Sequence, residues 1–320
     1  MQHLWWWVLA TLGVFPVFFT SPSDALVMLT KDSTVIGKIV IVSPQAGDLP
    51  TANGTALINA LSQIAATPTE PYVLKLGPGI YDVQDTSVLM KEYVDIEGSG
   101  EKITKITGAI SSETSSPTSG TVQGANNAEL RYLTVENVGA GTNTVAIYNS
   151  SSSPSILHVT ATAMSGTNNY GVYCSDSSPK IVDATATAEG GTGENAGLYN
   201  SRGYPVLTNV YTRGSSSLIG GVSYGVYNDL YQLTMTNVTV SAGGESSNSY
   251  AVYNSDGAVM ISHSVIEALN VMVFNGTTAL TSVTYTQLKG VAMDNTAGTL
   301  TCKFNFFPFG LFDENCAPLP

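Results

Sequence analysis

The chain has 320 residues, of which 43% are hydrophobic and only 11% are charged. Its 12 Lys and Arg against 24 Asp and Glu give a formal net charge of −12, which excludes a basic nucleic-acid-binding protein and opposes the binding of anionic polymers unless a metal bridges them. Regular apolar positions in a background rich in Gly, Ser, Thr and Asn exclude both a disordered chain and a charged helical bundle, and predict an all-β protein with many turns.

The N-terminus carries an apolar run, residues 4–19, that includes all three tryptophans. This run is shorter than the ~20 residues that a membrane-spanning helix needs. The small-residue pattern Ser23-Asp24-Ala25 follows it, so residues 1–25 are predicted to be a signal peptide that is cleaved after Ala25. A retained N-terminal anchor is the alternative, because His3 and the α-amino group are the sole candidates for positive charge before the run.

A short amphipathic helix is predicted next. Within residues 54–67, Leu57, Leu61 and Ile64 recur at helical spacing, and Asn53 is a candidate N-cap. Such a helix can cover the open end of a stacked β-structure, where unpaired strand edges would otherwise invite aggregation. Residues 26–71 are therefore predicted to form an N-terminal strand and a capping helix.

The centre of the chain repeats itself. Five segments share a core in which a small residue and an aliphatic residue precede a tyrosine, and four of them continue with an asparagine. The tyrosines are spaced 25, 26, 28 and 26 residues apart, and they are Tyr148, Tyr173, Tyr199, Tyr227 and Tyr253. A turn and a second alternating run, such as residues 156–163 or 181–188, follow the core before the unit restarts.

This period predicts a stacked fold. Alternation over five to eight residues indicates strands, and a unit of ~26 residues with two or three short strands buries its apolar face only against copies of itself. The Leu-x-x-Leu-x-Leu signature of leucine-rich repeats, the nearest rival, is absent. We therefore predict an all-β, single-stranded right-handed parallel β-helix (a solenoid) over residues 72–300, with successive rungs ~4.8 Å apart.

Stacking converts sequence columns into ladders. One column is predicted to be a ladder of hydrogen-bonded amides at a turn with positive φ. Its members are Asn149, Cys174, Asn200, Asn228 and Asn254, and Cys174 is accordingly expected to be a partly buried ladder residue and not a nucleophile. The tyrosine column either forms an outward stripe that stacks on sugar rings or packs inside the solenoid. Because it shares strand parity with glycines such as Gly171, inward packing is the preferred interpretation.

The C-terminus is predicted to be a cap, residues 301–320. In a secreted protein Cys302 and Cys316 can form a disulfide that closes this segment. The aromatic side chains between them are expected to plug the C-terminal end of the solenoid, and they are Phe304, Phe306, Phe307, Phe309 and Phe312.

Residues 40–150 carry a resemblance to a known family. Gly79-Ile80-Tyr81, the segment 94–100 (VDIEGSG), the segment 104–108 (TKITG) and the segment 133–137 (LTVEN) resemble the start of pectinesterase-like proteins of the pectin-lyase fold. The later rungs look more like secreted bacterial β-helix repeat proteins without an assigned activity. The resemblance implies a right-handed parallel β-helix.

The family's catalytic positions are altered in this chain. Pectinesterases use a Gln that helps to bind the oxyanion, an Asp acid/base one rung later and an Asp nucleophile one rung after that. The matching positions here are Asn143, Tyr170 and a segment near Asn195 that contains no Asp. Gln84-Asp85-Thr86 is similar to part of the second motif but lies in an earlier rung. Ester hydrolysis by this route needs one carboxylate to attack and another to move the proton, so no catalytic residue is assigned.

Four charged residues form a candidate ligand surface. Asp176 and Arg202 fall in one column, one rung apart, with Asp183 and Arg213 expected nearby. An ordinary surface ion pair, worth about 0–1 kcal/mol, is the preferred interpretation over a polar binding site.

The sequence therefore predicts a secreted or cell-surface protein that acts as a non-catalytic scaffold, an adhesin-like module or a glycan-binding module. The alternative is a carbohydrate-active enzyme of the pectinesterase or polysaccharide-lyase type. The expected partner is a polysaccharide or a cell-surface glycan, with no nucleic acid and no membrane span after signal cleavage. No metal or cofactor is expected, except for Ca²⁺ under the lyase alternative.

Overall fold

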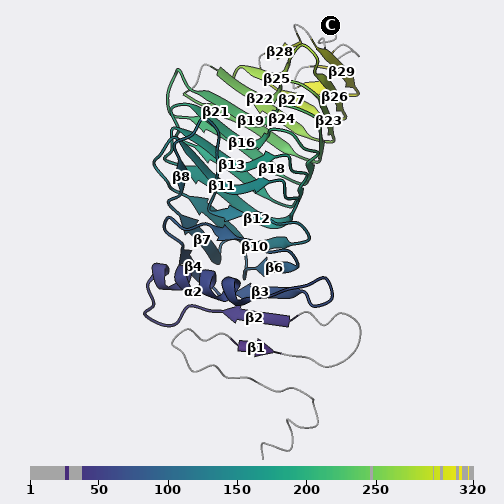
Figure 1. Cartoon of the computed structure of the whole chain (residues 1–320). Helices are drawn as coiled ribbons and strands as arrows, with labels where there is room; N and C mark the ends of the chain where they lie inside the picture. The colour runs from purple at the N-terminus through teal and green to yellow at the C-terminus, as the bar shows by residue number, and fades with distance from the viewer. Residues whose placement is uncertain are drawn as a thin grey trace, which may run out of the picture.

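The computed structural model describes residues 26–28, 38–245, 248–290, 292–295, 298–307, 310–311 and 316. The predicted signal segment, residues 1–25, lies outside the described residues. Among the helices that are described, none is long and apolar enough to cross a membrane. The strands stack along one axis, from the N-terminal strands and the helix at one end to the C-terminal strands at the other (Figure 1), as expected for a parallel β-solenoid.

Within the described residues the strands form two sheets. The first, of ten strands, contains β5 (Val88–Leu89), β8 (Ser111–Ser112), β9 (Val122–Gln123), β11 (Asn143–Ser150), β13 (Asn168–Ser175), β16 (Glu194–Asn200), β19 (Val222–Asn228), β22 (Asn248–Asn254), β25 (Val271–Asn275) and β28 (Ala292–Asp294). The second sheet has 21 strands and bends around the rest of the core.

The 21-stranded sheet begins at the N-terminal end of the solenoid. Its first strands are β1 (Leu26–Met28), β2 (Lys38–Val42), β3 (Tyr72–Leu76), β4 (Gly79–Asp82), β6 (Val94–Glu97), β7 (Thr104–Gly108), β10 (Glu129–Asn137) and β12 (Ser155–Met164). Those that follow are β14 (Lys180–Val182), β15 (Thr185–Glu189), β17 (Val206–Thr208), β18 (Tyr211–Ser216), β20 (Gln232–Thr236), β21 (Thr239–Gly244), β23 (Ala258–Ser262), β24 (Val265–Ala268), β26 (Leu280–Thr284), β27 (Gln287–Lys289), β29 (Thr299–Lys303), β30 (Phe306–Phe307) and β31 (Gly310–Leu311).

The register between rungs confirms the repeat. In the ten-stranded sheet β11, β13, β16, β19, β22 and β25 pair in parallel, each with the next. Their pairing places the five repeat tyrosines side by side and adds Phe274 as a sixth member of the column. A column of short side chains faces the interior in the other sheet, where Ala161, Ala186, Thr212 and Val240 pair in succession and are all buried.

The predicted amide ladder is confirmed, but its backbone conformation is not the one expected. Asn200 Nδ2 donates to Asn228 Oδ1 at 2.8 Å, and Asn228 Nδ2 donates to Asn254 Oδ1 at 2.9 Å, all three residues being fully buried. The positive φ values lie two residues further on, at Asp176 (51°) and Arg202 (116°). The asparagines stay in the ladder because a buried amide must find partners, and the next rung supplies them.

The predicted helix forms with a different start. Helix α2 covers Pro50–Gln63, begins after Leu49 and carries proline in its first turn, where a missing N–H costs nothing. Asn53 is therefore not the N-cap; it lies inside the helix and donates from Nδ2 to the Ile80 carbonyl at 3.0 Å. Leu57 and Leu61 are buried in the main core, so α2 covers the N-terminal end of the solenoid against β4 (Figure 1).

A column of left-handed residues bends the 21-stranded sheet along a corner. Each member has a φ between 49° and 56°. The first two lie within β10 and β12, and the later ones lie between two successive strands of a coil. The members, in rung order, are Tyr132, His158, Asp183, Asn209, Asn237, His263, Tyr285 and Phe304. A positive φ turns the chain sharply, so the coil closes around a narrow interior.

The C-terminal cap differs from the prediction in one respect. The disulfide between Cys302 and Cys316 is present, and both cysteines belong to the main core. Phe304, however, is 60% exposed and stacks on Tyr285 with ring centroids 5.1 Å apart. It extends the outer corner column and does not plug the end of the solenoid. Phe309 and Phe312 lie outside the described residues.

Candidate functional site

A bend in the coil places two tyrosines on the outer face of the ten-stranded sheet in three of the rungs. Gly171 faces inward so closely that a Cβ on it would lie 2.7 Å from both the Gly197 carbonyl oxygen and the Thr187 backbone nitrogen. Val172 also belongs to the main core. Since two successive residues face inward, strict alternation fails, and Tyr170 and Tyr173 on either side both face outward.

The outward tyrosines form an aromatic band. Its main column is stacked face to face, with centroids 4.3–5.8 Å apart, and consists of Tyr148, Tyr173, Tyr199, Tyr227, Tyr253 and Phe274. Tyr170, Tyr224 and Tyr250 pack edge-on against it. The tyrosines form a hydrophobic cluster separate from the main core, so the preferred inward packing is wrong.

The band leaves little ring surface for a ligand. Each inner ring, such as Tyr199 between Tyr173 and Tyr227, is covered on both faces by its neighbours. Stacking on a sugar needs an open ring face, so the band contributes to stability and is not assigned a binding role.

One carboxylate lies in the band, and the sequence reasoning missed it. Glu194 accepts a hydrogen bond from the Tyr170 hydroxyl at 3.0 Å. Burial raises the pKa of Tyr170, and the negative charge of Glu194 raises it further, so this phenol stays protonated at neutral pH. Glu194 directly precedes the Asn195 segment, so aligning the rungs one residue earlier would have found it.

The four predicted charged residues do not form one site. Arg202 Nη2 lies 3.0 Å from Asp176 Oδ2, and both side chains are about half exposed. Asp183 belongs to the corner column, where its carboxylate accepts a hydrogen bond from Asn209 Nδ2 at 2.9 Å and lies 3.7 Å from His158 Nε2. Arg213 lies in β18, 3.7 Å from Glu189. The structure thus brings the first pair together and gives the other two different partners.

Two further exposed tyrosines lie in the turns that follow the ten-stranded sheet, Tyr204 two residues after Arg202 and Tyr231 in the next turn, and the sequence reasoning missed them also. Tyr204 and Tyr231 stack with centroids 5.2 Å apart and are 55% and 51% exposed. They occupy successive turns after the ten-stranded sheet, outside the Gly-Val-Tyr-Asn core that drew attention to the other tyrosines. We call these four residues, Asp176, Arg202, Tyr204 and Tyr231, the aromatic corner.

The aromatic corner is held by backbone hydrogen bonds between turns. The Tyr204 N–H donates to Ser178 Oγ at 3.0 Å, and the Ser177 N–H donates to the Arg202 carbonyl at 3.0 Å. In the coil that follows Tyr231, the Ala258 N–H donates to the Tyr231 carbonyl at 2.8 Å. The rings are therefore carried on fixed turns of a stacked scaffold.

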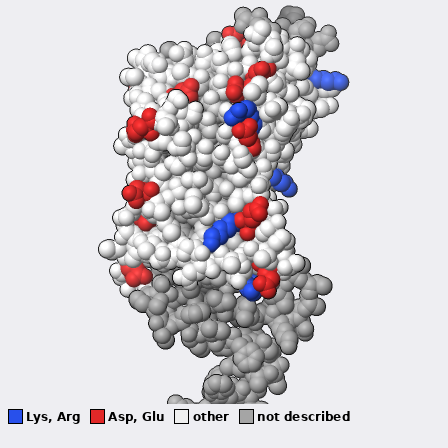
Figure 2. Space-filling model, in the orientation of Figure 1, with Lys and Arg blue, Asp and Glu red and all other residues white. Residues whose placement is uncertain are grey.

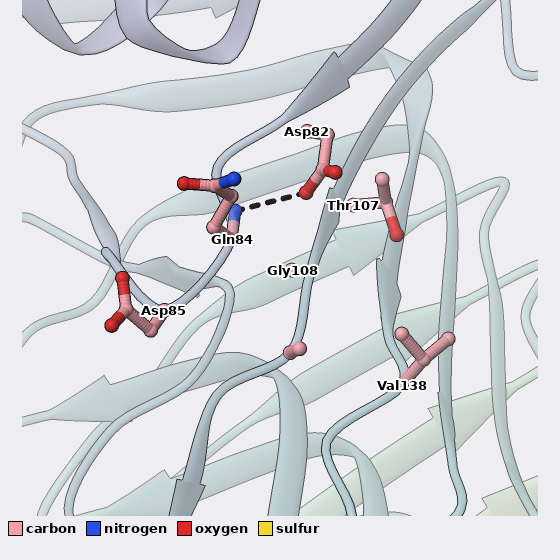
Figure 3. A pocket seen from close by; sticks show the side chains of 7 residues that line it. Asp82, Gln84, Asp85, Thr107, Gly108 and Val138 are labelled. Carbon is pink, nitrogen blue, oxygen red and sulfur yellow. Dashed lines mark hydrogen bonds between the residues drawn. The ribbon is translucent and has the colours of Figure 1, made fainter. Parts of the chain in front are cut away.

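A hollow of about 470 Å³ lies near the N-terminal end, at the Gln84-Asp85-Thr86 segment (Figure 3). Asp82 and Asp85 contribute carboxylates, and no basic side chain appears among the described residues that line it. The Gln84 N–H donates to Asp82 Oδ1 at 2.9 Å, so Asp82 stabilises the turn. The hollow is open and lacks a cationic partner, and we assign no chemistry to it.

Charge is sparse on the side that Figure 2 shows. Most of that face is uncharged, and several of the basic side chains lie beside acidic ones. The larger ion-pair network surrounds Arg131, which contacts Asp95, Glu97 and Glu129 at 2.6–3.0 Å. Three carboxylates surround the one guanidinium, so this network carries an excess of negative charge and offers no free basic surface for a polyanion.

The positions that match the pectinesterase motifs have structural roles. Asn143 is buried and donates from Nδ2 to the Thr114 carbonyl at 2.6 Å. Asn195 is fully buried and accepts a hydrogen bond from Asn169 Nδ2 at 3.0 Å. Tyr170 belongs to the aromatic band. These three side chains are used to hold rungs together and are not directed at a reacting group.

Comparisons with known proteins identify the fold. No family model matches the sequence, and no curated protein matches it. Among solved structures, a pectin methylesterase from carrot has 14% identity and a TM-score of 0.57, covering 85% of this chain and 90% of its own. PemA, a pectin methylesterase from Erwinia chrysanthemi, has 12% identity and a TM-score of 0.45, covering 88% and 92%.

The A-module of the mannuronan C-5 epimerase AlgE4 from Azotobacter vinelandii has 16% identity and a TM-score of 0.42, covering 80% of this chain and 91% of that module. At 14% identity the likeness to the carrot enzyme concerns the fold alone. The class of protein is therefore a parallel β-solenoid, and its activity must be argued from this chain's own residues.

Proposed function

We propose that the protein is a secreted or cell-surface, non-catalytic solenoid that binds a polysaccharide on its side. The proposal rests on the residues found at the positions that match the catalytic residues of pectinesterases, because these residues have structural roles in this chain. Tyr170 belongs to the aromatic band and Asn195 to a buried amide pair, so neither position supplies the carboxylate that ester hydrolysis requires. The fold shared with the carrot enzyme and the C-terminal disulfide support an extracellular, carbohydrate-related role.

An enzyme of the pectinesterase or polysaccharide-lyase type is the second candidate, and Glu194 favours it. This carboxylate lies on the outer sheet face one rung after Tyr170. Its partner weakens the case, because the raised pKa of Tyr170 keeps the phenol protonated, so it cannot act as a general base at neutral pH. One carboxylate with a protonated phenol does not complete the two-carboxylate route.

Turnover assays separate the two candidates. The purified chain is incubated with methylated and unmethylated polygalacturonate, each with and without Ca²⁺, and methanol release and chain cleavage are measured. We expect no turnover from the wild type or from Glu194→Gln. Methanol release or cleavage that Glu194→Gln abolishes would show that the protein is an enzyme.

Binding is measured separately, by affinity electrophoresis through gels that contain one polysaccharide each. The proposal expects at least one polysaccharide to retard the wild-type chain relative to an inert marker protein. Equal mobility in every gel would contradict polysaccharide binding and leave a purely structural role.

A further inference from the structure

We propose that the aromatic corner, formed by Tyr204, Tyr231, Asp176 and Arg202, is the polysaccharide-binding site and that it takes the rings of a neutral sugar chain. This inference rests on the proposed function and names its site and ligand class. Three properties of the corner carry it, namely open ring faces, polar groups in the same and the preceding turn without an excess of positive charge, and a rigid backbone.

The ring faces at the corner are open on both sides of the stacked pair. In the preceding coil, Ser178 occupies the position that corresponds to Tyr204. In the following coil, Gly257 occupies the position that corresponds to Tyr231, so no ring of the same column covers the outer face of either tyrosine. A Cβ on Gly257 would lie 2.3 Å from the Tyr231 carbonyl oxygen, so the glycine keeps this turn close to the ring without adding a side chain. Each tyrosine therefore stays more than half exposed although it is stacked.

An exposed aromatic pair beside polar groups suits a sugar. A pyranose ring presents C–H groups on its faces and hydroxyls around its rim, so it pairs with an aromatic face and with hydrogen-bonding groups beside that face. The Asp176 carboxylate and the Arg202 guanidinium each keep donor or acceptor capacity beyond their mutual contact. The solenoid continues on either side, so a chain running along the axis meets both rings in turn.

The charge at the corner selects against acidic sugars. Asp176 and Arg202 cancel each other, and Lys180 and Asp229, the nearest charged residues in sequence, are again of opposite sign. The turn that follows Tyr231 adds a further carboxylate, Asp256, directly before Gly257. The molecule as a whole carries −12. A polyuronate would therefore meet a repulsive field with no excess of cationic groups to offset it, whereas a neutral glycan would not.

The test uses affinity electrophoresis of the full chain with two classes of probe. The neutral probes are hydroxyethylcellulose, galactomannan and xylan, and the acidic probe is polygalacturonate. We expect a neutral polysaccharide to retard the wild type and polygalacturonate not to retard it. Tyr204→Ala should weaken the binding about tenfold or more, as truncation of an aromatic binding residue commonly does, whereas Tyr204→Trp should retain it.

Tyr211→Ala is the matched control, because Tyr211 is an exposed tyrosine of β18, beyond the left-handed corner column. Tyr204 has no positive φ, so alanine there introduces no backbone strain, whereas Tyr231 has a φ of 69° and is left unchanged. Thermal unfolding by circular dichroism confirms that each variant is folded.

The outcomes distinguish the inference from the proposed function. If the wild type binds a neutral polysaccharide and Tyr204→Ala binds it equally well, the aromatic corner is not the site, although the proposed function stands. Preferential binding to polygalacturonate would overturn the ligand class. Failure of the wild type to bind any probe would contradict the proposed function itself.

Discussion

The thiol of Cys174 replaces an amide in the asparagine ladder. Burial raises its pKa to about 12, while a contact from Asn149 Nδ2 at 3.9 Å partly offsets that effect. Because the thiolate is the reactive form and the sulfur is fully buried, we expect iodoacetamide at pH 8 to leave the native protein unmodified.

Unfolding in guanidinium without reductant should expose this cysteine to alkylation, while Cys302 and Cys316 stay protected in their disulfide. Intact mass spectrometry of the iodoacetamide-treated protein, native and unfolded, gives the number of alkylated cysteines. Rapid alkylation of the native protein would show that this rung opens, in conflict with a closed ladder.

The residues that share a column could be predicted from the sequence wherever they are counted from the repeat tyrosines. The pairing of Asp176 with Arg202 follows from counting residues from the tyrosines, and the structure places the two one rung apart. The direction in which the tyrosines face does not follow from counting, because the bend at Gly171 breaks the alternation. Tyr204 and Tyr231 lie in turns of unequal length, so no column of the sequence pointed to them.

At the scale of the element, glycines shape each coil. Gly171 has no positive φ, so its requirement is space alone: an added Cβ would lie 2.7 Å from the backbone of two neighbouring strands. We expect Gly171→Ala to lower the free energy of unfolding by about 1–3 kcal/mol through overpacking, which thermal or urea unfolding followed by circular dichroism would measure.

Gly220→Ala is the control for that substitution, because a Cβ on Gly220 would meet no atom within 4 Å. Its unfolding midpoint should stay close to that of the wild type. An equal loss for both variants would mean that alanine acts through something other than contact with the adjacent strands.

Helix α2 shows why element boundaries are harder to predict than element types. The spacing of Leu57 and Leu61 predicted the buried side of the helix correctly. Its start was misplaced because Asn53 was interpreted as a cap, whereas tertiary contact recruits its amide to the Ile80 carbonyl. Gly54 lets the helix approach β4, since a Cβ there would lie 2.0 Å from the Asp82 carbonyl oxygen.

At the scale of the whole molecule, each coil contacts mainly the coils before and after it. The stability of such a solenoid is close to a sum of coil and nearest-neighbour terms, so removing one complete coil should leave the stack able to close. Tyr170 pairs with Ala196 and Val172 with Leu198, an offset of 26 residues. The register was predictable from sequence because the shared tyrosine core marks equivalent positions in successive coils, although the offset itself varies from 25 to 28 residues between the five tyrosines.

Deletion of residues 171–196 joins Tyr170 to Gly197 and keeps every downstream column in register. We expect this variant to fold, with β-rich circular dichroism and one cooperative unfolding transition at a lower midpoint, because one inter-coil interface is lost. Deletion of residues 171–183 removes about half a coil and leaves strands of different sheets to be joined directly, so it should aggregate or remain unfolded. If the two deletions behaved alike, the coils would not be interchangeable units, and stacking would not be what holds the molecule together.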